Sequence, residues 1–170
     1  MSKIAVVGSN MMDLITYVNR MPLRGETIEA PTFEMGHGGK GANQAIAAAR
    51  LGSKVAMVTR VGDDAFADAT IANFQRNGID ATHVLRTPGR SSGVAQIFVE
   101  PSGENSILIV KGANADLTPA DVDAAAPALR DCKLILMQME VPVETVYHTV
   151  RKAKELGVPT LLYPAPAAPV

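Results

Sequence analysis

The chain has 170 residues and a formal net charge of −1, with 16 Lys and Arg against 17 Asp and Glu. A chain of this length can bury the core of one domain, and its near-neutral charge gives no electrostatic footprint for nucleic acid or an anionic membrane. The single Cys132 excludes an intrachain disulfide, and the start MSKIAVVG lacks the apolar run of a signal peptide, so we expect a cytoplasmic protein.

Short apolar runs alternate with helical patterns along the chain. Nearly continuous apolar residues, typical of strands buried on both faces, occupy positions 4–7, 55–61, 134–139 and 160–163. Helical spacing predicts helices over residues 41–50, 64–76, 119–130 and 142–156. The alternation predicts an α/β fold with a parallel sheet, right-handed crossovers and flanking helices.

Two β-rich stretches interrupt this alternation, at about residues 14–34 and 93–111. The second contains two strand-like runs joined by the turn sequence PSGEN, which is typical of a hairpin. Both stretches are too long for simple connections, so they predict a small second sheet beyond the carboxyl ends of the parallel strands, where ligands bind in such folds. The alternative is an antiparallel extension with only a packing role.

The sequence from Gly36 to Gly52, GHGGKGANQAIAAARLG, has four glycines within six positions just before a helical pattern. Glycine lets the backbone approach a ligand closely, and the first N–H groups of a helix favour oxygen-rich or anionic groups. We therefore expect a binding site here, although a tight turn that only begins a helix is the simpler alternative.

A dinucleotide site is another alternative, because Gly36, Gly38 and Gly41 satisfy the pattern GxGxxG and Asp63 follows about twenty residues later. Against it, this motif follows an irregular β segment and not the first buried strand. The scattered His37, His83 and His148 have no metal-ligand spacing.

Eight segments in order resemble the ribokinase-like (phosphofructokinase B type) family of carbohydrate kinases, and most of all its ribokinase and deoxyribokinase branches. They are VVGSNMMDLI near the start, RGET at 24–27, GGKGANQA at 38–45, VGDDAFA at 61–67, SSGVAQIFV at 91–99, KGAN at 111–114, LMQME at 136–140 and PAPA at 164–167. The resemblance implies the amino-terminal part of one α/β sugar kinase domain, with a small β-sheet lid, that transfers the γ-phosphoryl group of ATP to a primary sugar hydroxyl.

The resemblance also implies a sugar pocket. Its members would be Met11, Asp13, Gly39, Lys40, Asn43, Ala95, Ile97 and Glu140. Within it, Asp13, Asn43 and Glu140 would hydrogen-bond the sugar hydroxyls, and Ala95 and Ile97 would close over the sugar from the lid, which in this family often forms a dimer surface. Taken singly, Asp13 could cap a turn, Glu140 could be a solvated strand end and Lys40 could be a surface charge.

Met11 departs from the family pattern, because ribokinases usually carry an Asn at the corresponding position of the first motif, GSNMMD here. A thioether has no hydrogen-bond donor, so one sugar hydroxyl would lack a partner. If that hydroxyl is the one at C2, the pocket suits 2-deoxyribose, with residual activity on ribose. The alternative is that Met11 is a flexible core filler.

The resemblance places the catalytic base, and most of the sites for ATP, Mg²⁺ and a monovalent cation such as K⁺, in a later half of the family's fold that these 170 residues do not contain. We therefore expect no catalytic residue in this chain and little activity from it alone. The alternative function is a sugar-binding or dimerisation fragment without catalysis.

Overall fold

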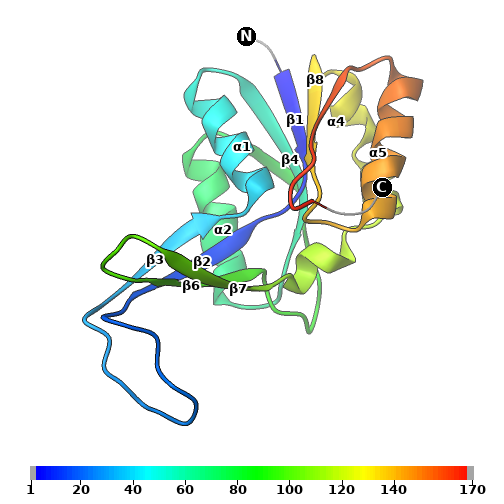
Figure 1. Ribbon diagram of the computed structural model, residues 1–170. Helices are drawn as coiled ribbons and strands as arrows, with labels where there is room; N and C mark the ends of the chain where they lie inside the picture. Colours follow the sequence, from blue (N-terminus) through cyan, green and yellow to red (C-terminus); the bar gives the residue numbers. More distant parts are fainter. Residues whose placement is uncertain (1–2, 168–170) are drawn as a thin grey trace.

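Five parallel strands form the central sheet of the computed structural model, which describes residues 3–167 (Figure 1). Their spatial order is β5-β4-β1-β8-β9, and every neighbouring pair is parallel. The strands are β1 Lys3–Val7, β4 Lys54–Val61, β5 Asp80–Arg86, β8 Leu134–Gln138 and β9 Thr160–Tyr163. The predicted parallel sheet is therefore confirmed.

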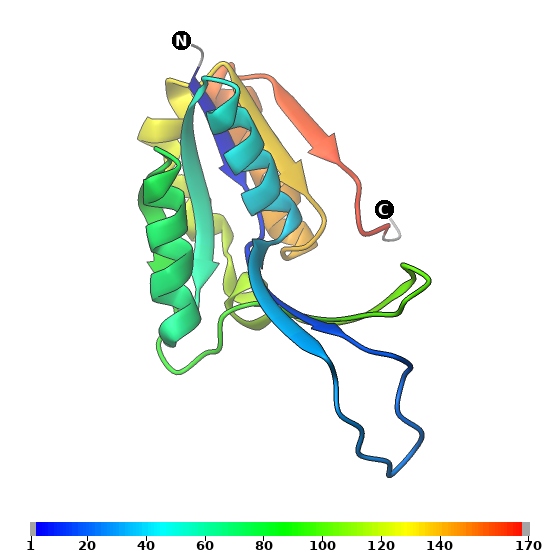
Figure 2. The ribbon, with the colours of Figure 1, turned by 90° about the vertical axis from the view of Figure 1, so that its left-hand side faces the viewer.

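Helices cover both faces of this sheet (Figures 1 and 2). Alternation along the strands produces two separate cores: Val6 packs in a cluster with Phe74 on one face, and Ala5 and Val7 pack in a cluster with Leu129 on the other. The first face carries α1 Lys40–Arg50 and α2 Ala65–Arg76, and the second carries α3 Pro119–Ala124, α4 Ala126–Arg130 and α5 Val143–Leu156.

A second sheet of four strands projects from the carboxyl ends of the parallel strands (Figure 2). We call it the lid. Its order is β3-β2-β6-β7, in which the central pair β2 and β6 is parallel and the two outer pairs are antiparallel. The strands are β2 Met11–Tyr17, β3 Thr32–Gly38, β6 Val94–Val99 and β7 Asn105–Val110, and the short 3₁₀ helix η1 Gly112–Asp116 returns the chain to the parallel sheet.

Two details differ from the prediction. Strand β5 was missed, because its sequence DATHVLR is mostly polar and lies at the edge of the sheet, where one side faces solvent. The predicted helix over residues 119–130 is divided into α3 and α4, and Pro127 stands within the first two positions of α4, where its missing N–H costs nothing. No helix within residues 3–167 is long and apolar enough to cross a membrane.

Candidate functional site

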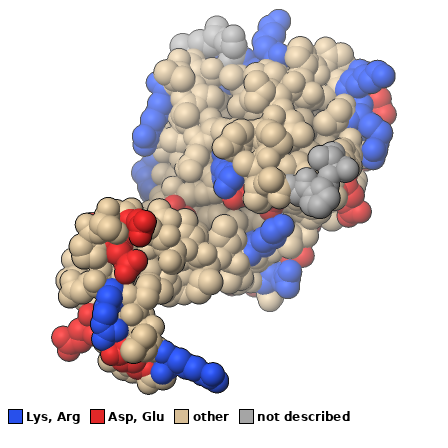
Figure 3. Space-filling model, viewed as in Figure 1, with Lys and Arg blue, Asp and Glu red and all other residues tan. Residues whose placement is uncertain are grey.

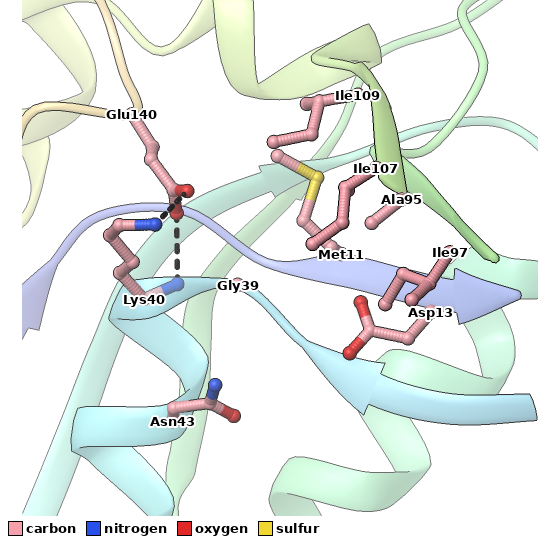
Figure 4. Close-up of a pocket in the computed structure, with 10 residues that line it drawn as sticks. All are labelled: Met11, Asp13, Gly39, Lys40, Asn43, Ala95, Ile97, Ile107, Ile109 and Glu140. Atoms are coloured by element: carbon pink, nitrogen blue, oxygen red, sulfur yellow. Dashed lines mark hydrogen bonds and ion pairs between the residues drawn. The ribbon is translucent and has the colours of Figure 1, made fainter. Parts of the chain in front are cut away.

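A pocket of about 260 Å³ lies where the lid meets the parallel sheet (Figure 4). It is lined by Met11, Asp13, Gly39, Lys40, Asn43, Ala95, Ile97, Ile107, Ile109 and Glu140. The structure thus brings together all eight residues that the sequence pointed to, although they lie as far apart as positions 11 and 140. Sequence reasoning missed Ile107 and Ile109, because positions 107–110 are all apolar and no alternation shows which side chains meet the pocket.

The glycine run forms the turn from β3 into α1, and close packing requires glycine at positions 39 and 41. Gly39 has a φ of 90°, and a Cβ there would lie 2.7 Å from the Cα of Asn10. A Cβ on Gly41 would lie 2.6 Å from the backbone nitrogen and oxygen of Ser9. The start of α1 therefore rests directly on the backbone that joins β1 to β2.

The N–H groups at the start of α1 already have partners within the protein. The Lys40 N–H donates to Glu140 Oε2 over 2.8 Å, the Gly41 N–H to Ser9 Oγ over 3.3 Å, and the Ala42 N–H to the Ser9 carbonyl over 2.8 Å. The expectation that these N–H groups face a ligand is therefore wrong: the carboxylate of Glu140 and the oxygens of Ser9 occupy them, and the helix dipole favours the negative charge of Glu140 there.

Glu140 follows β8 and is only 5% exposed, so it is no solvated strand end. In addition to the Lys40 N–H, it accepts hydrogen bonds from Ser9 Oγ over 2.5 Å and from Lys40 Nζ over 2.9 Å. Burial alone would raise the pKa of Glu140, but the hydrogen bonds from Ser9 and Lys40 outweigh it and hold the pKa below its ordinary value. Glu140 is therefore an ionised group that fixes Lys40 at the pocket rim.

Asp13 lies on β2 and points toward the pocket (Figure 4). Burial, with a smaller contribution from the negative charge of Glu140, raises its pKa. Space for its carboxylate depends on Gly38 of the neighbouring strand, because a Cβ there would lie 2.2 Å from Asp13 Oδ2. Among residues 3–167 no hydrogen-bond donor is assigned to this carboxylate, so it can accept hydrogen bonds from a ligand.

Apolar side chains of the lid stand beside Asp13 and form the wall across the pocket from Lys40 and Glu140 (Figure 4). Ala95 pairs with Ile109 and Ile97 pairs with Ile107 across β6 and β7, so all four side chains stand on one face of the lid. Ile107 and Ile109 are about half exposed, at 48% and 54%. Met11 closes the pocket at the base of the lid and is almost fully buried.

The site therefore combines hydrogen-bonding groups with an apolar wall. Asn43, on the first turn of α1, adds an exposed amide to the groups already described. Within residues 3–167, no cluster of three or more His, Cys, Asp and Glu side chains is placed to hold a metal ion. The arrangement suits a small ligand with several hydroxyls on one side and C–H surface on the other.

The glycines of the alternative dinucleotide motif do not follow a parallel strand. Gly36 and Gly38 are part of β3 in the antiparallel edge of the lid. The dinucleotide fingerprint needs its glycines in the turn after the first parallel strand, so this geometry excludes it. Asp64, after β4, caps α2 by accepting a hydrogen bond from the Ala67 N–H.

Comparisons with known proteins agree with this geometry. The family model described as "pfkB family carbohydrate kinase" matches residues 1–169. The chain is 60% identical to a deoxyribokinase of Salmonella typhi over 96% of its own length and 54% of that protein, and 42% identical to a ribokinase of Bacillus subtilis over 100% and 58%. It thus spans about half the length of the curated relatives it matches.

Solved structures show the same fold. The ribokinase of Arabidopsis thaliana, whose structure is described as a complex with ribose and ATP, superposes with a TM-score of 0.85 at 31% identity, over 95% of this chain and 53% of that one. The family model covers almost every residue, and relatives and structures agree with it. The chain belongs to the pfkB family of carbohydrate kinases.

Proposed function

We propose that this chain supplies the sugar site of a kinase that transfers the γ-phosphoryl group of ATP to the primary 5-hydroxyl of a pentose, 2-deoxyribose or ribose. The observation that carries the proposal is the pocket in which Lys40, Asn43 and Glu140 face Asp13 and the apolar side chains of the lid. Its support comes from relatives named deoxyribokinase and ribokinase and from a related structure that holds ribose and ATP.

The pocket has the size and chemistry for a monosaccharide. Its volume of about 260 Å³ is below the roughly 300–1,000 Å³ of pockets for drug-sized ligands. The carboxylate of Asp13 would accept hydrogen bonds from two sugar hydroxyls, while the ammonium group of Lys40 and the amide of Asn43 would donate to others. Ile107 and Ile109 would cover the C–H face of the ring.

The proposed preference of the pocket for 2-deoxyribose depends on Met11. Its thioether is a weak acceptor and donates nothing, so with the sugar C2 beside it a ribose hydroxyl would lose a partner. A hydrogen bond that is missing in a buried site costs about 1–3 kcal/mol. An apolar pocket therefore discriminates against the added hydroxyl of ribose by only about a hundredfold. We therefore propose a preference for 2-deoxyribose that still allows ribose to react.

The same resemblance assigns the catalytic base, the nucleotide, Mg²⁺ and a monovalent cation such as K⁺ to the part of the relatives that this chain does not match. Phosphoryl transfer depends almost entirely on positioning and charge stabilisation by such groups. We propose that the 170-residue chain on its own acts as a sugar-binding unit and transfers no phosphate.

We further propose a cytoplasmic homodimer formed through the lid. Large apolar side chains of the lid are exposed on both of its faces, among them Phe33, Met35, Ile107, Leu108 and Ile109. Exposed apolar patches of this kind are usually interaction surfaces. Sedimentation velocity would then give about twice the chain mass of 17.9 kDa, and a single species at 17.9 kDa would contradict the dimer.

Titration of the chain with 2-deoxyribose, ribose and a hexose, followed by NMR, tests the sugar site. We expect binding of both pentoses, tighter for 2-deoxyribose, and loss of binding in Asp13→Asn. The matched control is Asp131→Asn, whose carboxylate is largely exposed and faces Lys3 outside the pocket. If no pentose shifts any pocket resonance, or if both variants lose binding equally, the proposed sugar site is wrong.

A further inference from the structure

The lid is joined to the parallel sheet by four connections, and three of them meet at one side chain, Asn114 of η1. These three are the segment from β1 to β2, the segment from β5 to β6 and the exit from β7. Asn114 is fully buried and lies in the KGAN segment, whose role the sequence alone does not indicate.

The amide of Asn114 pairs with the backbone of Asn10 in both directions. Its Oδ1 accepts from the Asn10 N–H over 2.9 Å, and its Nδ2 donates to the Asn10 carbonyl over 2.7 Å. The same Nδ2 donates to the Lys111 carbonyl over 2.9 Å, at the end of the lid. One side chain therefore ties the residue before β2 to the residue after β7, as a short piece of strand would.

Asn10 connects Asn114 to the parallel sheet through its own side chain. Its Nδ2 donates to Thr59 Oγ1 over 2.9 Å and to the Arg60 carbonyl over 2.8 Å, both on β4. The third connection passes through the same point, since a Cβ on Gly93 would lie 2.2 Å from Asn114 Nδ2. These groups are buried and, apart from the Oδ1 of Asn10, which is unpartnered within residues 3–167, each makes at least one of these hydrogen bonds, so the lid cannot turn about its base without breaking several of them.

The pocket depends on this junction because its lining is divided between the two sheets. Asp13 and the apolar wall belong to the lid, whereas Lys40 and Glu140 belong to the parallel-sheet side. In addition, the sulfur of Met11 lies 3.8 Å from Asn114 Nδ2, so the same amide borders the thioether at the pocket base.

We propose that Asn114 is a positioning residue, which sets the orientation of the lid relative to the parallel sheet and seats Met11 in the pocket. Its effect on sugar binding rests on the proposed function, whereas its effect on the lid does not. The residue touches no reacting group, so it acts only through Met11 and the lid.

The test uses two variants of the 170-residue chain. Asn114→Asp keeps one acceptor but removes the donors to Asn10 and Lys111, and Asn114→Ser removes the bridge without adding charge. Val146→Ala, on the buried face of α5 and away from the lid, is the control for a general loss of stability. Asn105→Asp, exposed on β7, is the control for the amide-to-carboxylate change.

Lid orientation is measured without sugar, by the distance between spin labels on Ser106→Cys in the lid and Lys154→Cys on α5, in a Cys132→Ala background. We expect one narrow distance distribution in the parent chain and in both controls, and a broad or shifted one in the Asn114 variants. A narrow, unshifted distribution in whichever Asn114 variant folds would overturn the proposal, as would equal broadening in Val146→Ala.

Sugar binding is the second readout. We expect the Asn114 variants to bind 2-deoxyribose at least about tenfold more weakly, with a smaller ratio between 2-deoxyribose and ribose, while the controls keep the parent affinity and ratio. An unchanged affinity and ratio would overturn the seating of Met11. If the parent chain binds neither sugar, the proposed function fails, and the label distances alone decide the role of Asn114.

Discussion

Glu140 receives two hydrogen bonds from one residue, from the backbone N–H of Lys40 over 2.8 Å and from its ammonium group over 2.9 Å. The two residues are separated by 100 positions, and they connect the end of β8 to the start of α1. This contact replaces a local cap, because α1 has no side-chain hydrogen bond at Gly39 and no acidic residue in its first turn. A long-range carboxylate thus does the work that an Asp or Ser performs at most helix starts.

Replacement of Glu140 by Gln should destabilise the chain. An amide in this place would set an Nε2 donor against the donors of Ser9 and Lys40, and a buried polar group left unsatisfied costs about 1–3 kcal/mol. Urea unfolding at pH 7 measures the loss. Glu104→Gln, exposed in the lid turn, is the matched control and should change the free energy of unfolding by less than about 0.5 kcal/mol. Equal effects of the two variants would contradict the role given to Glu140.

The pH dependence of this effect has a definite direction. The folded pKa of Glu140 is lowered from an ordinary value of 4.5, so its stabilisation is present above that value and is lost as the pH falls through the folded pKa. The difference in the free energy of unfolding between the parent chain and Glu140→Gln should therefore shrink as the pH falls below about 4.5. Urea unfolding at a series of pH values tests this, and a difference that grows on acidification would be inconsistent with it.

Asp13 should show the opposite sign. Its folded pKa is raised from an ordinary value of 3.8, so ionisation of Asp13 destabilises the folded chain. This cost is absent below pH 3.8, where Asp13 is protonated, and is fully present once the pH has risen through the folded pKa. Asp13→Asn should therefore raise the thermal midpoint at pH 7 and have little effect at pH 3.5, with a gain within the range of about 0.5–2 kcal/mol that single stabilising substitutions commonly give. Thermal melts at both pH values measure it. A lower midpoint at pH 7 would show that Asp13 supports the fold.

The sequence predicted the parallel sheet and its helices because these elements rest on local patterns of apolar residues. The family resemblance brought the eight pocket residues together, although positions 11 and 140 share no local signal. What escaped prediction depends on contacts between distant segments. The glycine run predicted free N–H groups for a ligand. Only the folded structure shows that these N–H groups already donate to Ser9 and Glu140. The junction at Asn114 is equally invisible in a single sequence, since its partner Asn10 lies 104 positions away.

Gly38 and Gly36 provide a matched pair of substitutions on one strand. In Gly38→Ala the new Cβ would lie 2.2 Å from Asp13 Oδ2, whereas in Gly36→Ala the new Cβ would meet Asp13 Cβ at an ordinary 3.8 Å. We expect Gly38→Ala to displace the carboxylate and to weaken pentose binding about tenfold or more, a cost of about 1–3 kcal/mol for overpacking. NMR titration with 2-deoxyribose measures both variants. Equal affinities would mean that Asp13 does not contact the sugar from its present position.

Met11→Asn tests the sugar preference directly. The amide restores a donor and an acceptor in place of a thioether, so it should favour ribose and leave an unpaired amide when 2-deoxyribose binds. We expect the ratio of the two affinities to move toward ribose by about tenfold to a hundredfold, with most of the change arising from weaker 2-deoxyribose binding. The control is Met35→Asn, on the exposed face of β3, which should leave the ratio unchanged. If Met11→Asn lowers both affinities by the same factor, Met11 only fills space, and the preference must come from another residue of the pocket.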